Sequence, residues 1–147
     1  LTPDEINAEW AEKRLLELAD HDDVKGRVIF TGGVDREEVL GWLHFSNYHV
    51  IPVRFMNSGA VVVESWASHT PVIQSDVVDP NLVEEGVNGF LFEANNSDDL
   101  ARKLVVAYEN SSDSKQLAIN GNKLVQEKFN YDYLLSLYEK TYSEILM

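Results

Sequence analysis

Residues 57–73 have the sequence NSGAVVVESWASHTPVI, which can be interpreted as a strand or as a helix. The three consecutive valines favour a strand, because β-branched side chains are enriched there. Gly59 just before them, and the spacing from Ala60 to Ala67, favour a buried helix that begins abruptly. Glu64 lies inside this apolar run, where a carboxylate is costly unless a partner binds it.

The composition is that of a folded and acidic chain. Its 147 residues, 44% hydrophobic and 10% aromatic, fit one compact domain with an ordinary core. The formal net charge of -13 repels phosphate backbones and anionic membranes, so we expect no nucleic-acid partner. An anionic ligand must therefore be held locally, by backbone amides or a few cations.

Metal and membrane sites are not expected from the sequence. There is no cysteine, and the 4 histidines are far apart without the spacing of metal ligands. No apolar run approaches the roughly 18 residues of a membrane span, and the first ten residues are too acidic for a signal peptide. We therefore expect a cytoplasmic protein, without a metal and without a membrane span.

Short apolar runs predict four strands, at residues 27–33, 48–53, 71–75 and 89–93. Helical patterns separate them, and this alternation indicates a parallel sheet, because each parallel connection needs a crossover. If 48–53 and 71–75 are neighbouring strands, the segment between them is the crossover. We therefore predict that the valines after Gly59 form a helix.

Two further helices are expected before this crossover. The first runs from about residue 2 to 19, and its expected buried face consists of Ile6, Trp10, Leu15 and Leu18. The second begins after Asp35, which acts as its cap. Its expected inward-facing residues are Val39, Leu40 and Leu43.

The last third of the chain is predicted to be helical. Ser97 is the expected cap of a helix that bears Leu100, Leu104 and Ala107. A second helix covers about 114–128, and a third runs from Asn130 to the end. The apolar residues at helical spacing in the third are interpreted as core, namely Tyr131, Leu134, Leu135, Tyr138 and Tyr142.

The turn before the crossover helix is the candidate binding site. Ligands of open parallel sheets gather at the carboxyl ends of the strands, where free amides at a helix N-terminus bind phosphate. Gly59 would let a ligand approach the backbone, or it simply permits a tight turn. Glu64 would accept hydrogen bonds from two ribose hydroxyls, or it is a solvent-facing residue on the helix edge. Both alternatives remain open at this point.

The stretch from Pro52 to Ile73 resembles the signature of retaining, nucleotide-sugar-dependent glycosyltransferases of the GT-B architecture. That signature has a strand ending in proline, Glu-Gly-Phe-Gly, Glu-Ala-Met-Ala and a strand beginning Pro-Val-Ile. Here Pro52, Gly59, Glu64, Ala67 and the PVI at 71–73 are in register with it. RVIFTGGV and NLVEEGVNGFLFEANNSDDLARKL also resemble family segments, so the resemblance covers residues 27 to about 108.

The resemblance implies an α/β fold, with a Rossmann-like parallel sheet flanked by helices. It implies that residues 1–147 are a single domain, the later part of a GT-B C-terminal nucleotide-sugar-binding domain, with an incomplete sheet and a helical C-terminal third. The implied enzyme moves a sugar from a nucleoside diphosphate sugar to an acceptor with retention, without a metal or other cofactor. The acceptor, a sugar or a lipid, would be bound by an absent N-terminal domain. The piece alone should be inactive, and the missing part is where peripheral membrane association would arise.

The resemblance also assigns roles to residues. Glu64 matches the glutamate that binds the donor ribose, and Gly59 and Ala60 match the helix start that meets the diphosphate. Gly33 and Val34 match the loop along the nucleotide base.

Three positions of the candidate site depart from the signature. Met56 replaces the glutamate that contacts the donor sugar, and Asn57 and Ser58 replace the Gly-Phe pair. Because of Met56, an alternative function is a degenerate, non-catalytic module that binds a nucleotide or stabilises a partner subunit. A flavodoxin-like or receiver-type domain is a weaker interpretation, because its acidic cluster or flavin loop is not seen.

Overall fold

The computed structural model describes residues 3–55, 59–79 and 81–146, with side chains from Trp10 onward. The chain divides into two compact units, Leu1–Asp35 and Arg36–Met147. The single domain inferred from the sequence stays a prediction.

The first unit contains helix α1, Pro3–Ala19, which confirms the predicted helix. The predicted buried face is wrong, because Trp10, Leu15 and Leu18 are all at least half exposed. The described residues of this unit contain no second helix or strand that would cover them. Helical spacing correctly identified the helix, but it could not supply a packing partner. The side chain of Ile6 lies outside the described part.

The strand predicted at 27–33 is also wrong. Val28, Ile29 and Phe30 have no regular secondary structure and are 45%, 76% and 51% exposed. A strand is defined by hydrogen bonds to a neighbour, and no described strand pairs with this segment. An apolar run of the right length is therefore not enough to make a strand.

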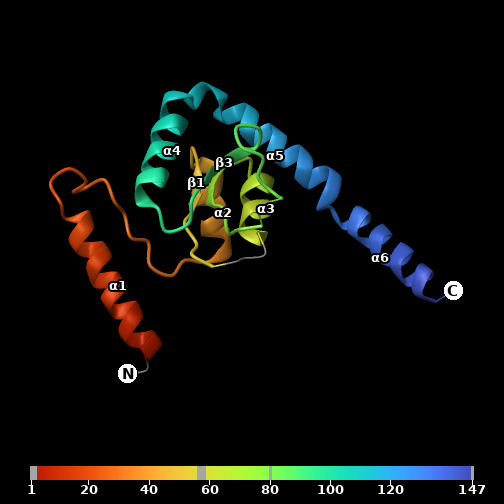
Figure 1. The fold of residues 1–147 in the computed structure, drawn as a ribbon, viewed down its shortest axis with the longest axis horizontal. Helices are drawn as coiled ribbons and strands as arrows, with labels where there is room; N and C mark the ends of the chain where they lie inside the picture. Colours follow the sequence, from red (N-terminus) through yellow and green to blue (C-terminus); the bar gives the residue numbers. More distant parts are fainter. Residues whose placement is uncertain (1–2, 56–58, 80, 147) are drawn as a thin grey trace. The chain divides into compact units, whose positions relative to one another are not determined.

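The second unit contains a parallel sheet of three strands in the order β1-β2-β3 (Figure 1). The strands are β1 His49–Ile51, β2 Val72–Ser75 and β3 Gly89–Phe92, each within a predicted range. In the register, Val50 is opposite Ile73, and Ile73 is opposite Phe90. Only the central strand β2 has a neighbour on each side among the described residues.

The valine-rich segment is helix α3, Ala60–Ala67, as predicted. It connects two parallel neighbours, so the crossover requirement overrides the strand preference of the valines. Val62 and Trp66, four residues apart, are both fully buried. The side of α3 that carries Val62 and Trp66 therefore packs in the core.

The described part of the second unit contains four other helices: α2 Arg36–Phe45, α4 Ser97–Glu109, α5 Ser114–Lys128 and α6 Tyr131–Ile145. A short 3-10 turn, Ser111–Asp113, precedes α5. The predicted cap of α4 is one residue off, because Oδ1 of Asn96 accepts the hydrogen bond from the Asp99 amide at 3.0 Å.

The predicted inward face of α2 is only partly correct, and α4 shows a similar pattern. Leu43 of α2 is buried, but Val39 and Leu40 are 40% and 38% exposed. On α4, Ala107 is buried, whereas Leu104 is 42% exposed. Both helices therefore bury a narrower face than the apolar pattern predicts.

The predicted core role of the α6 residues is wrong in the described structure. Each of the five residues is exposed, namely Tyr131, Leu134, Leu135, Tyr138 and Tyr142. No residue of α6 is buried. The periodicity again identified a helix correctly, while burial depends on whether another element covers the apolar face.

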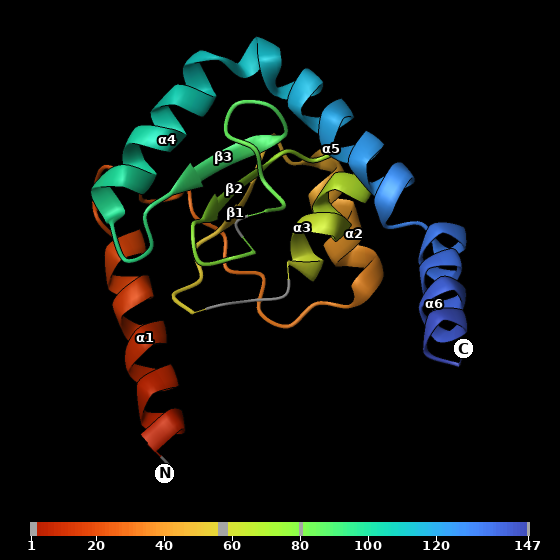
Figure 2. The same ribbon diagram turned by 45° about the vertical axis from the view of Figure 1, so that its right-hand side comes forward.

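Two hydrophobic clusters lie on the two faces of the sheet. Adjacent residues of a strand point to opposite faces: Val72 joins the cluster of α3, while Ile73 joins the cluster that includes Ala107 of α4. Figures 1 and 2 show α3 and α4 on different sides of the sheet. The second unit therefore has a helix, sheet, helix arrangement.

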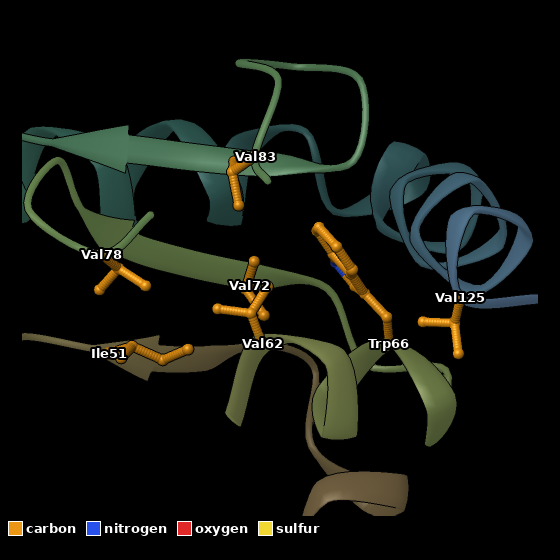
Figure 3. Packing of buried hydrophobic residues seen from close by; sticks show 7 residues of the cluster. All are labelled: Ile51, Val62, Trp66, Val72, Val78, Val83 and Val125. Atoms are coloured by element: carbon orange, nitrogen blue, oxygen red, sulfur yellow. The ribbon is translucent and has the colours of Figure 1, made fainter. Parts of the chain in front are cut away.

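Trp66 is the largest fully buried side chain of the first cluster. Its Nε1–H donates to the backbone carbonyl of Asn88 at 3.0 Å, and its own carbonyl accepts from Nδ2 of Asn122 at 3.0 Å. Figure 3 shows Trp66 between Val72 and Val125 of α5. A Cβ on Gly121 would lie 2.2 Å from Cδ1 of Trp66, so α3 and α5 pack without room for a methyl group.

Within the described residues, none of the helices is both long and apolar enough to span a membrane.

Candidate functional site

The site begins at Gly59, the residue before α3. Gly59 is buried and has a φ of 72°, in the left-handed region that favours glycine. A Cβ here would lie 2.2 Å from Cδ1 of Leu82 and 3.8 Å from Cβ of Asp79. Leu82 of the same unit therefore occupies the space that a side chain at position 59 would need. This observation supports the tight-turn interpretation of Gly59.

The two residues after Gly59, Ala60 and Val61, form the start of α3. Ala60 is exposed, while the carbonyl of Gly59 accepts hydrogen bonds from Val62 and Val63 at 3.0 and 3.2 Å. Among the described residues, the N–H groups of Ala60 and Val61 have no backbone partner, as expected in the first turn of a helix. They are at the positive end of the helix dipole, where an anion is stabilised.

Glu64 lies on the same face of α3 as Ala60, because residues four apart are neighbours on a helix. Its side chain is 40% exposed, whereas Val62 and Trp66 are fully buried. The carboxylate is therefore at the border between core and solvent. This position is compatible with both the ribose-binding and the helix-edge interpretation.

Glu64 has a partner that the sequence did not reveal. Nη2 of Arg36, the first residue of α2, donates to Oε1 of Glu64 at 3.2 Å. The two residues are 28 positions apart, and no short motif connects them. The contact depends on how α2 and α3 pack, so no sequence signal could have identified it.

The opposite side of α3 is fixed by a hydrogen-bonded pair. The Oγ of buried Ser65 lies 2.6 Å from Nδ1 of His49 and donates to the carbonyl of Val61 at 2.7 Å. Burial lowers the pKa of His49, which favours a neutral imidazole. These contacts connect β1 to the first turn of α3, behind the exposed face that carries Glu64.

Met56, Asn57 and Ser58 lie outside the described residues. Gly33 and Val34 belong to the first unit, and their assignment to the nucleotide base stays a prediction.

Arg54 lies three residues after the end of β1. It lines a cavity of about 300 Å³ with Pro52, Phe92, Leu100 and residues 95–97. This cavity lies where β1 and β3 end and α4 begins, at the carboxyl edge of the sheet. Among the described residues, Arg54 has no ion pair.

The described side chains form no cluster of three or more histidines and acidic residues that could hold a metal ion.

Comparison with known proteins identifies relatives of the chain. An uncharacterised glycosyltransferase of Methanocaldococcus jannaschii is 31% identical over 126 residues, which is 85% of this chain and 34% of the relative. The chain therefore spans about a third of this curated relative.

Solved structures resemble the fold over most of the chain. Sucrose-phosphate synthase of Thermosynechococcus elongatus is 27% identical, with a TM-score of 0.79 over 92% of this chain and 35% of its own. HepE of Anabaena, solved with UDP and glucose, is 21% identical, with a TM-score of 0.81 over 95% of this chain and 38% of its own. These likenesses confirm the predicted fold class, part of a GT-B glycosyltransferase.

The family model of glycosyl transferases group 1 matches residues 7–110, more than half of the chain. The sequence resemblance and the fold therefore agree with an independent match that spans both units. The chain belongs to the glycosyl transferases group 1 family.

Proposed function

We propose that this chain binds the nucleoside diphosphate sugar donor of a glycosyltransferase, which transfers the sugar to an acceptor with retention at the anomeric carbon. The main support is the placement of Ala60 and Glu64 on one accessible face of α3, after the carboxyl end of β1. A helix start can bind the diphosphate, and a carboxylate one turn further can bind the ribose.

In the proposed reaction, the bond between the sugar and the diphosphate breaks, and negative charge develops on the diphosphate. The amides of Ala60 and Val61, at the positive end of α3, would stabilise this charge. Glu64 would accept hydrogen bonds from the ribose hydroxyls and hold the donor in place. The acceptor, a sugar or a lipid, would be bound by a domain outside this chain.

The chain is acidic, so an anionic donor needs local stabilisation. The net charge of -13 gives an unfavourable field for a diphosphate at long range. Backbone amides provide donors without a charged side chain, which is one reason to assign the diphosphate to the start of α3.

Titration of nucleotides into the intact protein tests the proposal. UDP, GDP and ADP are each measured by calorimetry, with UDP first because HepE, which has this fold, was solved with it. We expect one of the three to bind best. Glu64→Ala should weaken binding of that nucleotide by at least about tenfold, because each hydrogen bond to a charged group contributes about 1.5 to 3 kcal/mol.

Glu127→Ala is the matched control, because Glu127 is also an exposed helical glutamate in an ion pair, with Lys123 at 3.8 Å. It should leave nucleotide binding unchanged. If Glu64→Ala binds all three nucleotides as the unchanged protein does, Glu64 does not bind the donor and the proposal fails.

The alternative is a non-catalytic module that binds a nucleotide or stabilises a partner subunit. The replacement at Met56 favours it. An assay of the intact protein for release of nucleoside diphosphate from UDP-, GDP- and ADP-sugars separates the two functions. Nucleotide binding without turnover on any of these donors would favour the alternative.

A further inference from the structure

Arg36 and Glu64 form a pair between the first residue of α2 and the second turn of α3. The distance from Nη2 to Oε1 is 3.2 Å, and the two side chains are 77% and 40% exposed. No other cation of the described residues lies within ion-pair distance of Glu64. Arg36 is therefore the one described cation that pairs with this carboxylate.

The stability of the fold does not account for the position of Arg36. A cation at the first residue of a helix faces the positive end of the helix dipole, which is unfavourable. An ion pair this exposed contributes little to folding. The first turn of α2 otherwise carries acidic residues, Glu37 and Glu38, as the dipole prefers. Arg36 thus departs from the charge pattern of its own helix, and its described ion pair is with α3.

The pair leaves Glu64 able to bind a ligand. A carboxylate has two oxygens with about four acceptor positions. Arg36 uses one position on Oε1, and Oε2 has no hydrogen-bond partner among the described residues. Two adjacent hydroxyls of a ribose could therefore both be accepted while the pair with Arg36 stays intact.

The positive charge of Arg36 would also favour binding of an anionic donor beside Glu64. A nucleoside diphosphate is an anion, and a bare carboxylate beside its ribose would repel it. The guanidinium stays protonated at all physiological pH values, so it offsets the charge of Glu64 while leaving acceptors free. This compensation is local, in a chain whose net charge is -13.

We propose that Arg36 is a positioning residue for the donor: it orients and neutralises Glu64 so that the carboxylate accepts both ribose hydroxyls. The inference rests on the proposed function, because it takes Glu64 to be the ribose-binding residue. It predicts that Arg36 affects recognition of the ribose specifically, without contacting the diphosphate.

The test uses the intact protein and pairs of nucleotides. UDP, GDP and ADP are each titrated beside the 2′,3′-dideoxy analogue, and the ratio of the two dissociation constants measures recognition of the ribose. Glu64→Gln should remove most of this preference. Arg36→Met keeps the length of the stem but removes the charge. It should weaken binding of the ribonucleotide by about twofold to fivefold, the range for an exposed ion pair. Binding of the dideoxy analogue should be unchanged.

Two further variants complete the test. Arg36→Lys keeps the positive charge and should restore part of the preference that Arg36→Met loses. Arg102→Met is the matched control, because Arg102 is also an exposed arginine paired with a carboxylate, Asp99, at 3.1 Å. It should leave both dissociation constants unchanged. Thermal denaturation of each variant verifies that the fold is intact.

The outcomes separate the two proposals. If Glu64→Gln loses the ribose preference but Arg36→Met keeps it, the positioning role of Arg36 is wrong and the donor site stands. If Arg36→Met weakens the ribonucleotide and the dideoxy analogue equally, Arg36 contacts the diphosphate or supports the fold, and the inference is overturned. If Glu64→Gln itself has no effect on the preference, the proposed function fails together with the inference.

Discussion

The indole Nε1–H of Trp66 donates to the backbone carbonyl of Asn88 at 3.0 Å, and both residues are buried. The side chain of Asn88 in turn binds the amide of Glu84 at 2.8 Å and the carbonyl of Leu82 at 3.1 Å. Leu82 is the residue that packs against Gly59. The loop before β3 and the start of α3 are thus held by one connected set of contacts.

Replacement of Trp66 by phenylalanine should destabilise the second unit. It removes the donor to the buried Asn88 carbonyl and leaves a smaller ring in the core, which together cost about 2 to 4 kcal/mol. The measurement is chemical denaturation of the intact protein followed by circular dichroism. Trp42→Phe is the control, because Trp42 is 49% exposed and its loss should change stability by less than about 0.5 kcal/mol. Equal losses for the two variants would contradict the structural role of Trp66.

Gly121→Ala should also be destabilising, although alanine is the better helix former. Its Cβ would lie 2.2 Å from Cδ1 of Trp66, and overpacking of this kind costs about 1 to 3 kcal/mol. Gly41→Ala, in α2, is the matched control, since a Cβ there meets nothing within 4 Å. That variant should gain up to about 1 kcal/mol from helix propensity. Denaturation midpoints that move in opposite directions would confirm the close packing of α3 on α5, and an increase for both would refute it.

The stability of the second unit should decrease on mild acidification because of His49. Burial holds the pKa of His49 below its unfolded value of about 6.5, so the unfolded chain binds the proton more readily. The contribution is fully present above that value and is lost as the pH falls from it through the folded pKa. His49→Gln should flatten the dependence of the denaturation midpoint on pH in this window. An unchanged slope in His49→Gln would exclude this role.

The sequence predicted the parts of the fold in which one element constrains the next. The valine segment was assigned to a helix because two parallel strands on either side required a crossover, and α3 has this form. The strand at 27–33 and the buried faces of α1 and α6 failed for a common reason. Periodicity reports what an element would bury, but burial also requires a partner, which single-sequence patterns do not contain.

The candidate site was predictable to a similar extent. Glu64 was proposed as a site residue from its apolar surroundings and from the family resemblance, both of which are local in sequence, and its role stays a prediction. Arg36 was not identified, because its contact with Glu64 depends on the packing of two helices 28 residues apart. The role of Trp66 was missed as well, since its partners Asn88, Gly121 and Asn122 are distant in sequence.

The packing of Trp66 has a consequence for the proposed donor site. Trp66 and Glu64 are two residues apart on a helix of 8 residues, so the helix turns as one piece. At the outer radius of a helix, about 5 to 6 Å, a turn of about 10° moves a side chain by about 1 Å. Binding sites tolerate about 0.5 Å. Under the proposed function, substitutions in α5 that touch no ligand would therefore change how well Glu64 binds the donor ribose.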